Sequence, residues 1–495
     1  MATSAAVLEQ TATDYEVVIG LEVHAQLLTQ SKMYCGCSAR YADAEPNTHV
    51  CLVCGGFPGA LPVMNRAAVE AAMLTGLALN CEIPPHCKMD RKNYVYPDLP
   101  KGYQVSQYDL PLCINGVLEF VSGGEVVRAG ITRVHMEEDT GRLVHQHDAS
   151  GAQISLVDLN RSGVPLMEIV GEPDLRSAEQ ARDYLMALRQ ILRYIGVSTG
   201  NMEEGAFRCD ANISVRRPGD PLGSKVEVKN MNSFRAVERA LRFEQERQLE
   251  RIATGQPIEQ ETRGWVEERG VTVSQRTKEQ AHDYRYFPEP DLPPLAISPE
   301  MVASVRERLP ALPVERRAHL MAQYGLGAAD ADLLTAERET VDYFDAVVGN
   351  GSAERAKAAA NWILNDLMAL QRVRSLPAAE LPLSVVQLQD LLDALDEGAL
   401  TGRAAKELLP QIAADELPRA AAARLNLLAL NDEGPVIAAA RETLAAFPAA
   451  VADYQSGKKT AIGRLIGETI KRTGGRANPD QVRRILEAEL NASTQ

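Results

Sequence analysis

Cysteine and long apolar runs are both scarce in this chain, and each scarcity excludes a class of protein. Eight cysteines spread over 495 residues are too few for a disulfide scaffold, so we expect reduced thiols or metal ligands. No run of roughly 18 apolar residues is present, and the first residues lack a basic stretch followed by a hydrophobic block. The sequence therefore predicts a cytoplasmic protein without a membrane span or an export signal.

Two familiar phosphate-handling signatures are also missing. The chain contains no G-x-x-x-x-G-K-[ST] loop and no kinase-type catalytic loop. If the protein uses ATP, some other fold must hold the nucleotide. The net charge of −15 argues against a generally basic protein that coats nucleic acid.

The C-terminal end is nevertheless basic. Between Gln455 and Gln495, eight lysines and arginines stand against four acids, so this segment carries +4 and the rest of the chain −19. A basic end on an acidic protein can contact a polyanion. Surface helices often carry such an excess by chance, and the charge alone leaves both interpretations open.

Composition changes along the chain and predicts the α+β class. The first part, residues 1–297, reads as a mixed α/β domain in which strand-like runs alternate with turns. Helices are expected after Ser177, which has a capping-box spacing to Gln180, and from about Phe234 to Ala253. Five prolines between Pro288 and Glu300 exclude a helix or a central strand, and they predict a domain boundary.

Beyond the prolines the chain reads as all-helical. Alanine, leucine, glutamate and arginine recur with helical spacing, as in the segment that contains Ile363 and Leu367. A turn signal at Asn431-Asp432-Glu433-Gly434-Pro435 indicates a new helix start. We therefore divide this half into a helical domain, 298–430, and a small helical tail domain, 431–495.

Acidic residues and one histidine interrupt four segments whose alternation is typical of β-strands. Glu22 and His24 lie two residues apart in VVIGLEVHAQL, so on a strand they share one face. The run AGITRVHMEEDTG is strand-like as far as Met136, and three acids follow. RCDANISVR and KVEVKN alternate in the same way, with Asp210 and Glu227 on their polar sides.

Oxygen-rich ligand sets with few nitrogens suit Mg²⁺, which often holds substrate phosphates as well. The four segments therefore predict a magnesium site, with phosphoryl transfer as its chemistry. Solvated surface acids are the alternative, because 67 acidic residues make acidic clusters inevitable. Glu22 argues against that alternative for its own segment, since an unpaired carboxylate in an apolar strand costs several kcal/mol.

Four of the cysteines form two close pairs. Cys35 and Cys37 are separated by 13 residues from Cys51 and Cys54. Two short turns that each aim two sulfurs at one ion are typical of a structural Zn²⁺ site, in which four protein ligands leave no position for substrate. Four unrelated thiols are the alternative. The remaining cysteines lack such pairing and are expected in the core: Cys81, Cys87, Cys113 and Cys209.

Cations and tyrosines are combined in the proline-rich segment from Asp90 to Pro111. Arg91, Lys92 and Lys101 lie there among turn residues. Such a loop can bind a phosphate or a nucleotide base, but structural loops use tyrosine and proline in the same way. The residues alone leave both the binding role and the structural role open.

Ordered motifs over nearly the whole chain resemble one known family, the B subunit of the aspartyl/glutamyl-tRNA amidotransferase. The motifs are IGLEVHAQL, DRKNYVYPDLPKGYQVSQ, HMEEDTGR, SLVDLNRSGVPLMEIV, MEEGAFRCDANISVR, VEVKNMNSF, DYRYFPEPDLPPL and DYQSGKKTAIGRLIGETIKR. The resemblance implies a cradle-like N-terminal catalytic domain that carries a zinc loop (35–54), then a helical domain and a tail that helps to hold tRNA.

The activity that the resemblance implies is that of a ligase in translation. Such a protein uses ATP and Mg²⁺ to phosphorylate the side-chain carboxylate of Asp or Glu on a misacylated tRNA. Ammonia, released from glutamine by an amidase-type A subunit, then gives Asn-tRNA(Asn) or Gln-tRNA(Gln). A small C subunit completes the heterotrimer, and a non-discriminating aminoacyl-tRNA synthetase is a further candidate partner.

The resemblance also implies roles for particular residues. The Mg²⁺ shell is expected to comprise Glu22, His24, Glu138, Asp210 and Glu227, with Glu137 adjacent. Lys92 is expected at the mouth of the ammonia channel, and with Glu22, His24, Glu137 and Glu138 it completes the catalytic set. The four paired cysteines occur in only some family members, as suits a structural Zn²⁺. Candidate tRNA contacts are Lys458, Lys459, Arg464, Lys471 and Arg472.

Two other functions remain alternatives at this point. A non-catalytic tRNA-binding scaffold would need only the zinc loop and the basic tail. A free-standing Mg²⁺-dependent phosphohydrolase would turn over small phosphates by itself. The sequence does not decide between Asp-tRNA(Asn) and Glu-tRNA(Gln) as substrates, and it does not locate the contacts to the ATP base.

Overall fold

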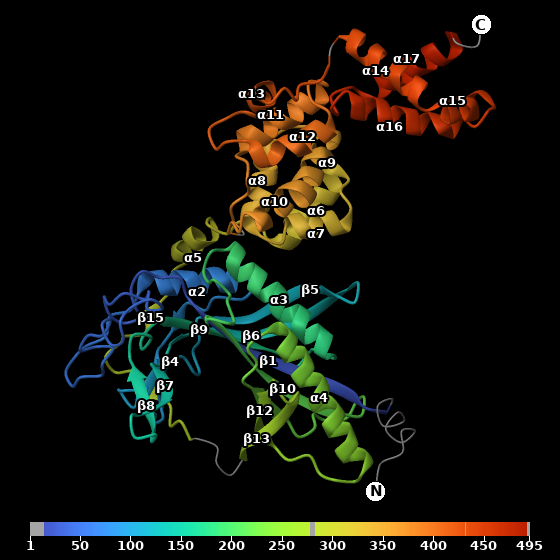
Figure 1. Cartoon of the computed structure of the whole chain (residues 1–495). Coiled ribbons are helices and arrows are strands. Elements are labelled where there is room, and N and C mark those ends of the chain that lie inside the picture. Colours follow the sequence, from blue (N-terminus) through green and yellow to red (C-terminus); the bar gives the residue numbers. More distant parts are fainter. Residues whose placement is uncertain (1–13, 278–282, 378, 431, 493–495) are drawn as a thin grey trace. The chain divides into compact units, whose positions relative to one another are not determined.

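The computed structural model describes residues 14–277, 283–377, 379–430 and 432–492 (Figure 1). The chain divides into two compact units, Met1–Leu312 and Pro313–Gln495. The first combines a large β-sheet with helices and the second is helical. This confirms the predicted α+β class, while the domain limits at 297 and 430 stay predictions.

An eight-stranded sheet is the framework of the first unit. Its order is β13-β12-β11-β10-β1-β9-β6-β5, and β11–β12 is its parallel pair. The strands are β1 (Glu16–Gln26), β5 (Cys113–Ser122), β6 (Glu125–Glu138), β9 (Pro165–Gly171), β10 (Phe207–Arg216), β11 (Val226–Lys229), β12 (Glu261–Val266) and β13 (Val271–Thr277). Strands far apart in sequence, such as β1 and β10, are therefore hydrogen-bonded neighbours.

Three helices pack against this sheet: α2 (Arg66–Ala78), α3 (Ala178–Tyr194) and α4 (Phe234–Ala253). Leu21 and Val23 of β1 share one buried core with Leu188 of α3 and Leu241 of α4. The predicted bounds of α4 are confirmed. Ser177 accepts from the backbone N–H of Gln180 as a cap does.

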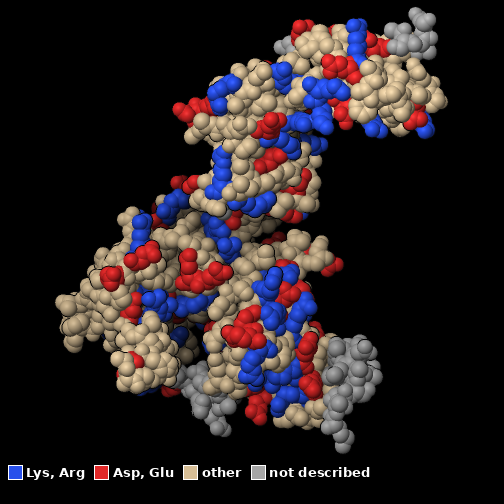
Figure 2. Space-filling view, in the orientation of Figure 1, with Lys and Arg blue, Asp and Glu red and all other residues tan. Residues whose placement is uncertain are grey.

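The outer faces of α3 and α4 are covered with charges of both signs (Figure 2). Arg182 of α3 pairs with Glu238 of α4 at 2.7 Å, and Arg242 pairs with Glu238 at 2.8 Å. Pairs at the protein surface are worth at most about 1 kcal/mol each. These ion pairs balance part of the charge on the two faces.

Three small sheets lie beside the large one. They are β14 (Phe287–Pro288) with β3 (Asp90–Asn93) and β4 (Tyr103–Ser106), β15 (Leu295–Ala296) with β2 (His86–Cys87), and the hairpin β7 (Arg142–His147) with β8 (Gln153–Asp158). Both β14 and β15 are edge strands, and an edge position suits Pro288 of β14, which has no N–H to donate. The first unit then continues through α5 (Pro299–Arg306) to Leu312.

The second unit is built from helices. They are α6 (Pro313–Tyr324), α7 (Ala328–Leu334), α8 (Arg338–Val348), α9 (Ala353–Asn361), η2 (Trp362–Leu367), α10 (Met368–Val373), α11 (Val385–Asp396), α12 (Gly402–Leu408), η3 (Leu409–Gln411), α13 (Pro418–Arg424), α14 (Glu433–Ala446), α15 (Pro448–Gln455), η4 (Lys459–Ala461), α16 (Ile462–Arg472) and α17 (Pro479–Ala492). The η2 segment is π-helical, and it buries Trp362, Ile363 and Leu367.

The last helices have an apolar core of their own. Val436, Leu465, Val482 and Leu486 are buried together there. Asp432 caps α14 at the predicted turn, whereas Asn431 lies outside the described residues.

None of the described helices alone has the length and apolar character needed to cross a membrane. The pair α14 and α15 reaches that measure only when taken together, and it is bent by 91°.

Candidate active site and metal centre

The face of the sheet opposite its apolar core carries charged side chains. Along β1, Leu21 and Val23 are buried in the core, whereas Glu22 and His24 alternate with them onto the other face. On β10, Asp210 and Asn212 alternate in the same way with Ala211 and Ile213. The predicted alternation of these strands is confirmed, and it creates one polar surface across several strands.

Register places one carboxylate between two histidines on this surface. Glu168 of β9 lies opposite His24 of β1 on one side and His135 of β6 on the other. Its Oε2 is 3.4 Å from His24 Nε2 and 3.2 Å from His135 Nε2. Glu137 completes the cluster, with Oε1 3.4 Å from His135 Nε2. We call these four residues the acid–histidine centre.

The carboxylates and imidazoles of the centre shift one another's pKa. Burial lowers the pKa of His135, but the carboxylates of Glu168 and Glu137 outweigh burial and raise that pKa to about 9. The pKa of His24 is also raised against the effect of burial, chiefly by Glu168. In return, the pKa of Glu168 lies well below its ordinary value despite burial, because both imidazoles stabilise the carboxylate.

Glu137 is held by residues of the β3–β4 hairpin. It accepts hydrogen bonds from Ser106 Oγ at 2.7 Å and from Gln104 Nε2 at 3.2 Å. Lys92 Nζ lies 3.9 Å from Glu137 Oε1 and 5.0 Å from the centre of the Tyr284 ring. Although burial opposes ionisation, Lys92 lowers the pKa of Glu137. The segment of cations and tyrosines therefore borders the centre.

Glu138 does not join this centre. The sequence predicts that β6 ends at Met136, but the strand continues through Glu138, so Glu137 and Glu138 point to opposite sides. Glu138 pairs with Lys101 and accepts from the backbone N–H of Val105 at 3.0 Å. It lines a cavity of about 260 Å³ that Tyr34, Lys101, Cys35 and Cys54 also line.

Glu22, Asp210 and Glu227 form a second acidic group beside the acid–histidine centre. Lys229 pairs with Asp210 and lies 3.0 Å from Glu227 Oε1. Asn212 donates to Glu22 Oε1 at 2.9 Å. Burial first, and then the carboxylates around it, raise the pKa of Glu22. The three carboxylates of this group thus carry more negative charge than the single ammonium of Lys229 balances.

The donor sets fit divalent cations. His24, Glu137 and Glu168 each offer one ligand atom, and these three atoms lie within 4.8 Å of one another. The set combines one imidazole with two carboxylates. The raised pKa of Glu22 is a second indication, because a bound cation would relieve the same excess of negative charge. Of the expected Mg²⁺ ligands, the structure thus places His24 in one group and Glu22, Asp210 and Glu227 beside it.

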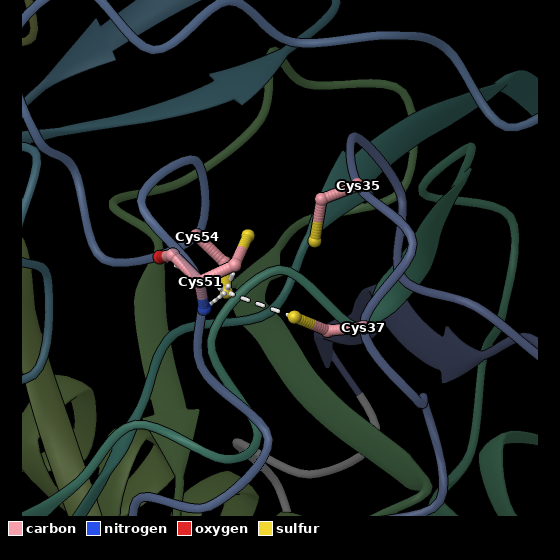
Figure 3. A group of neighbouring side chains, drawn as sticks. All are labelled: Cys35, Cys37, Cys51 and Cys54. Carbon is pink, nitrogen blue, oxygen red and sulfur yellow. Dashed lines mark hydrogen bonds between the residues drawn. The ribbon is translucent and has the colours of Figure 1, made fainter.

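The four paired cysteines converge on a common space (Figure 3). Cys54 Sγ lies 3.9 Å from Cys51 Sγ and 4.0 Å from Cys37 Sγ, and all four sulfurs lie within 4.8 Å of one another. Four thiols at this spacing fit a tetrahedral Zn²⁺. The pKa of Cys54 is lowered, mainly by a hydrogen bond from Cys35 and also by Lys32. We call this set the four-cysteine centre.

The other four cysteines lie elsewhere, as predicted. Cys87, Cys113 and Cys209 are buried in the core of the first unit, and Cys81 packs against it. Burial raises their pKa, so they are unreactive small core residues.

The candidate tRNA contacts are exposed on the tail. They are Lys458, Lys459, Arg464, Lys471 and Arg472. Lys458 pairs with Asp453 at 3.1 Å and Arg472 with Glu442 at 3.2 Å, so part of this positive charge is balanced locally. Arg464 lies over the ring of Phe447.

Two residues of the acid–histidine centre, Glu168 and His135, were missed by the sequence analysis. Both carry the signal that singled out Glu22. Glu168 interrupts the apolar run PLMEIV, and His135 alternates with Glu137 in RVHMEE. Their role depends on register between β9, β1 and β6, which no local pattern reveals.

Comparison with known proteins finds two family models that match this chain. A family model described as the GatB/GatE catalytic domain matches residues 17–303, which include nearly all of the large sheet. A second, described as the GatB domain, matches residues 342–490. The fold and the site thus define a protein of the GatB/GatE catalytic class with a helical C-terminal part.

The relatives narrow this class to B subunits of the aspartyl/glutamyl-tRNA(Asn/Gln) amidotransferase. The chain is 54% identical over 479 residues to that of Thermomicrobium roseum, covering 96% of this chain and 99% of that protein. It is 50% identical over 488 residues to that of Dehalococcoides mccartyi, with coverage of 97% and 99%. It is 51% identical over 479 residues to that of Moorella thermoacetica, with coverage of 96% and 100%. The chain belongs to the family of aspartyl/glutamyl-tRNA(Asn/Gln) amidotransferase B subunits.

Proposed function

We propose that this chain is the transamidating component of a tRNA-dependent amidotransferase. It would activate the side-chain carboxylate of Asp on tRNA(Asn), of Glu on tRNA(Gln), or of both, using ATP. Ammonia would come from glutamine hydrolysed by an amidase-type A subunit, with a small C subunit completing a heterotrimer. The observation that carries this proposal is the acid–histidine centre inside a domain that matches the catalytic domain of the family.

The chemistry needs two displacements. An oxygen of the side-chain carboxylate bonds to the γ-phosphorus of ATP, and ADP leaves. Ammonia then bonds to the acyl carbon, phosphate leaves, and the nitrogen loses one proton. Activation is required because a carboxylate oxygen is a poor leaving group, whereas phosphate is a good one.

The residues around the centre suit these steps. Lys92, beside Glu137, would supply positive charge to a phosphate bound at the centre. Ser106 and Gln104 hold Glu137 in one orientation, so its carboxylate is preorganised. When bound by His24, Glu137 and Glu168, with Glu22 nearby, Mg²⁺ would neutralise phosphate charge. The four-cysteine centre would hold a structural Zn²⁺ and take no part in the reaction.

A single variant separates this function from a tRNA-binding scaffold. We expect His24→Ala, in the reconstituted complex, to lower ATP-dependent amidation of mischarged tRNA by about 100-fold or more. Glutamine hydrolysis and tRNA binding, measured separately, should be retained. The matched control is His145→Ala, which removes an exposed histidine of the β7–β8 hairpin.

Normal amidation by His24→Ala would overturn the assignment and favour the scaffold. Assaying the isolated chain tests the phosphohydrolase alternative, because that function requires turnover of small phosphates without partner subunits. Presenting the complex with Asp-tRNA(Asn) and Glu-tRNA(Gln) in turn identifies the substrate.

A further inference from the structure

Lys32 is a fully buried lysine whose ammonium group lies against the four-cysteine centre. Its exposed fraction is 0%. Lys32 Nζ donates to the carbonyl of His49 at 2.7 Å, to the carbonyl of Leu159 at 3.4 Å and to Cys54 Sγ at 3.6 Å. A lysine ammonium has three N–H donors, so each finds an acceptor.

The charge of Lys32 lacks a carboxylate partner. Within the part of the chain that the structure describes, its polar contacts are the two carbonyls and the sulfur, and it forms no ion pair with Asp or Glu. Carbonyl groups solvate an ammonium but do not neutralise it. Because a buried charge is costly unless paired, the sulfur side must supply the counter-charge.

Binding of Zn²⁺ would supply that negative counter-charge, because it converts the four thiols to thiolates. Cysteines bind Zn²⁺ as thiolates, and four thiolates around one Zn²⁺ leave two net negative charges on the centre. A buried ammonium at Cys54 balances one of them. Metal and lysine therefore stabilise each other, since each removes an unbalanced charge that the other leaves.

Lys32 also ties the four-cysteine centre to the loop that carries Gly163. The Leu159 carbonyl belongs to this loop, and the backbone N–H of Met33 donates to the Gly163 carbonyl at 2.7 Å. Gly163 has a φ of +84°, and a Cβ placed there would lie 3.3 Å from Cys54 Cβ and 3.8 Å from Glu138 Oε2. Gly163 thus lies close to both Cys54 and Glu138, which line the same cavity.

We propose that Lys32 is the internal counter-ion of a metal-loaded four-cysteine centre, and that through Leu159 it positions loop 159–163 beside Glu138. This inference rests on the proposal that the four cysteines bind a metal. Lys32 is a positioning residue, because it acts on the surroundings of Glu138 only through the loop.

The test compares metal affinity in the full chain. The Zn²⁺ dissociation constant of Lys32→Met, measured by competition with a chelator, is expected to rise about 10- to 100-fold. Lys32→Gln, which can still donate to the carbonyls but has no charge, should show a rise of the same kind. Co²⁺ loading, followed by its sulfur-to-metal absorption band, gives a second readout. The control is Lys88→Met, since Lys88 pairs with Asp90 and Asp109 and not with sulfur.

Melting temperatures with and without metal separate the alternatives. If Lys32 is the counter-ion, Lys32→Met lowers the melting temperature of the loaded protein more than that of the stripped protein. Equal losses in both states, with an unchanged Zn²⁺ dissociation constant, would mean a purely structural lysine and overturn the inference. If the unaltered chain binds neither Zn²⁺ nor Co²⁺, the proposed metal centre itself fails, which is a distinguishable result.

Discussion

The carboxylate of Glu168 lies 3.2 Å from the imidazole of His135, and the same oxygen lies 3.4 Å from His24 on the other neighbouring strand. One acid therefore bridges two histidines that are 111 residues apart in sequence, at positions 24 and 135. Burial lowers the pKa of both imidazoles, and Glu168 makes the largest of the charge contributions that raise it. The reactivity of the centre should depend on this one carboxylate more than on any other.

Replacing Glu168 by Gln tests that dependence. Without the carboxylate, the pKa of His135 should fall from about 9 toward the ordinary histidine value, and that of His24 should fall as well. Histidine titration by NMR in metal-free buffer measures both. Amidation should drop by about 100-fold or more. Glu119→Gln, an exposed acid on β5, is the control, and an unchanged titration of His135 would contradict the bridge.

Lys229→Met should make stability dependent on a divalent cation. Removing this ammonium leaves Glu22, Asp210 and Glu227 unbalanced, and we expect a loss of about 1 to 3 kcal/mol in chelator at pH 7. The raised pKa of Glu22 sets the sign of the pH dependence. The contribution of Glu22 to stability is highest below its pKa in the unfolded chain, and it falls as pH rises through its pKa in the folded chain.

Thermal unfolding from about pH 4 to about pH 8 measures the stability loss of Lys229→Met and its dependence on pH. Added Mg²⁺ should raise the melting temperature of Lys229→Met more than that of the unaltered chain. Lys225→Met, at an exposed position just before β11, should behave like the unaltered chain. An identical Mg²⁺ response in both variants would argue against a cation site near Glu22.

Asp139→Asn should destabilise the first unit at neutral pH. Burial raises the pKa of Asp139, but Arg208 and Arg161 outweigh it and lower that pKa below its ordinary value. The charge therefore contributes stability above the unfolded pKa of about 3.9, and this contribution is lost as pH falls through the folded pKa. We expect a cost of about 3 to 5 kcal/mol at pH 7.

Denaturant unfolding at about pH 7 and about pH 3 checks the prediction for Asp139. The difference between Asp139→Asn and the unaltered chain should shrink at the lower pH. Asp43→Asn, at an exposed position, should change little at either pH. A difference that grows on acidification would have the wrong sign for a paired carboxylate.

Cys51→Ser should abolish metal binding at the four-cysteine centre, because three sulfurs and one hydroxyl form a much weaker Zn²⁺ site. Metal content of the purified chain measures this, and the melting temperature in Zn²⁺ should fall to that of chelator-treated protein. Cys81→Ser removes a thiol outside the centre and should keep its metal. Equal metal content in the two variants would refute the assignment.

Lys459→Ala and Lys471→Ala should weaken tRNA binding without changing its specificity. Each lost phosphate contact is expected to reduce the slope of log affinity against log salt by about 0.7 to 0.9. Binding titrations at several salt concentrations measure that slope. Arg441→Ala is the control, since its guanidinium already pairs with Glu489. Unchanged slopes in both lysine variants would place tRNA elsewhere.

Local patterns predicted much of the fold. The alternation in β1 and β10, the bounds of α4 and the convergence of the four cysteines depend on residues close together in sequence, and the structure confirms them. The pattern failed at the end of β6, where two glutamates extend a strand that was expected to stop. Glutamate has low strand propensity, but pairing with β9 holds both residues in the ladder.

The acid–histidine centre shows the limit of such patterns. Sequence singled out Glu22, His24 and Glu137 as polar interruptions, but it could not show that Glu168 lies between His24 and His135. It also could not show that Glu138 turns toward Lys101. Each of these facts follows from which strands are neighbours and in which register.

By itself, the sequence determined the polar and apolar faces of individual strands and helices, the cysteine pairs and the family to which the chain belongs. Only the tertiary structure decided which polar residues meet, because β1, β6 and β9 come from distant parts of the chain. A shift of one residue in their register would turn Glu168 into the apolar core. Burial of that core on one face of the sheet therefore sets the register, and the register builds the site on the other face.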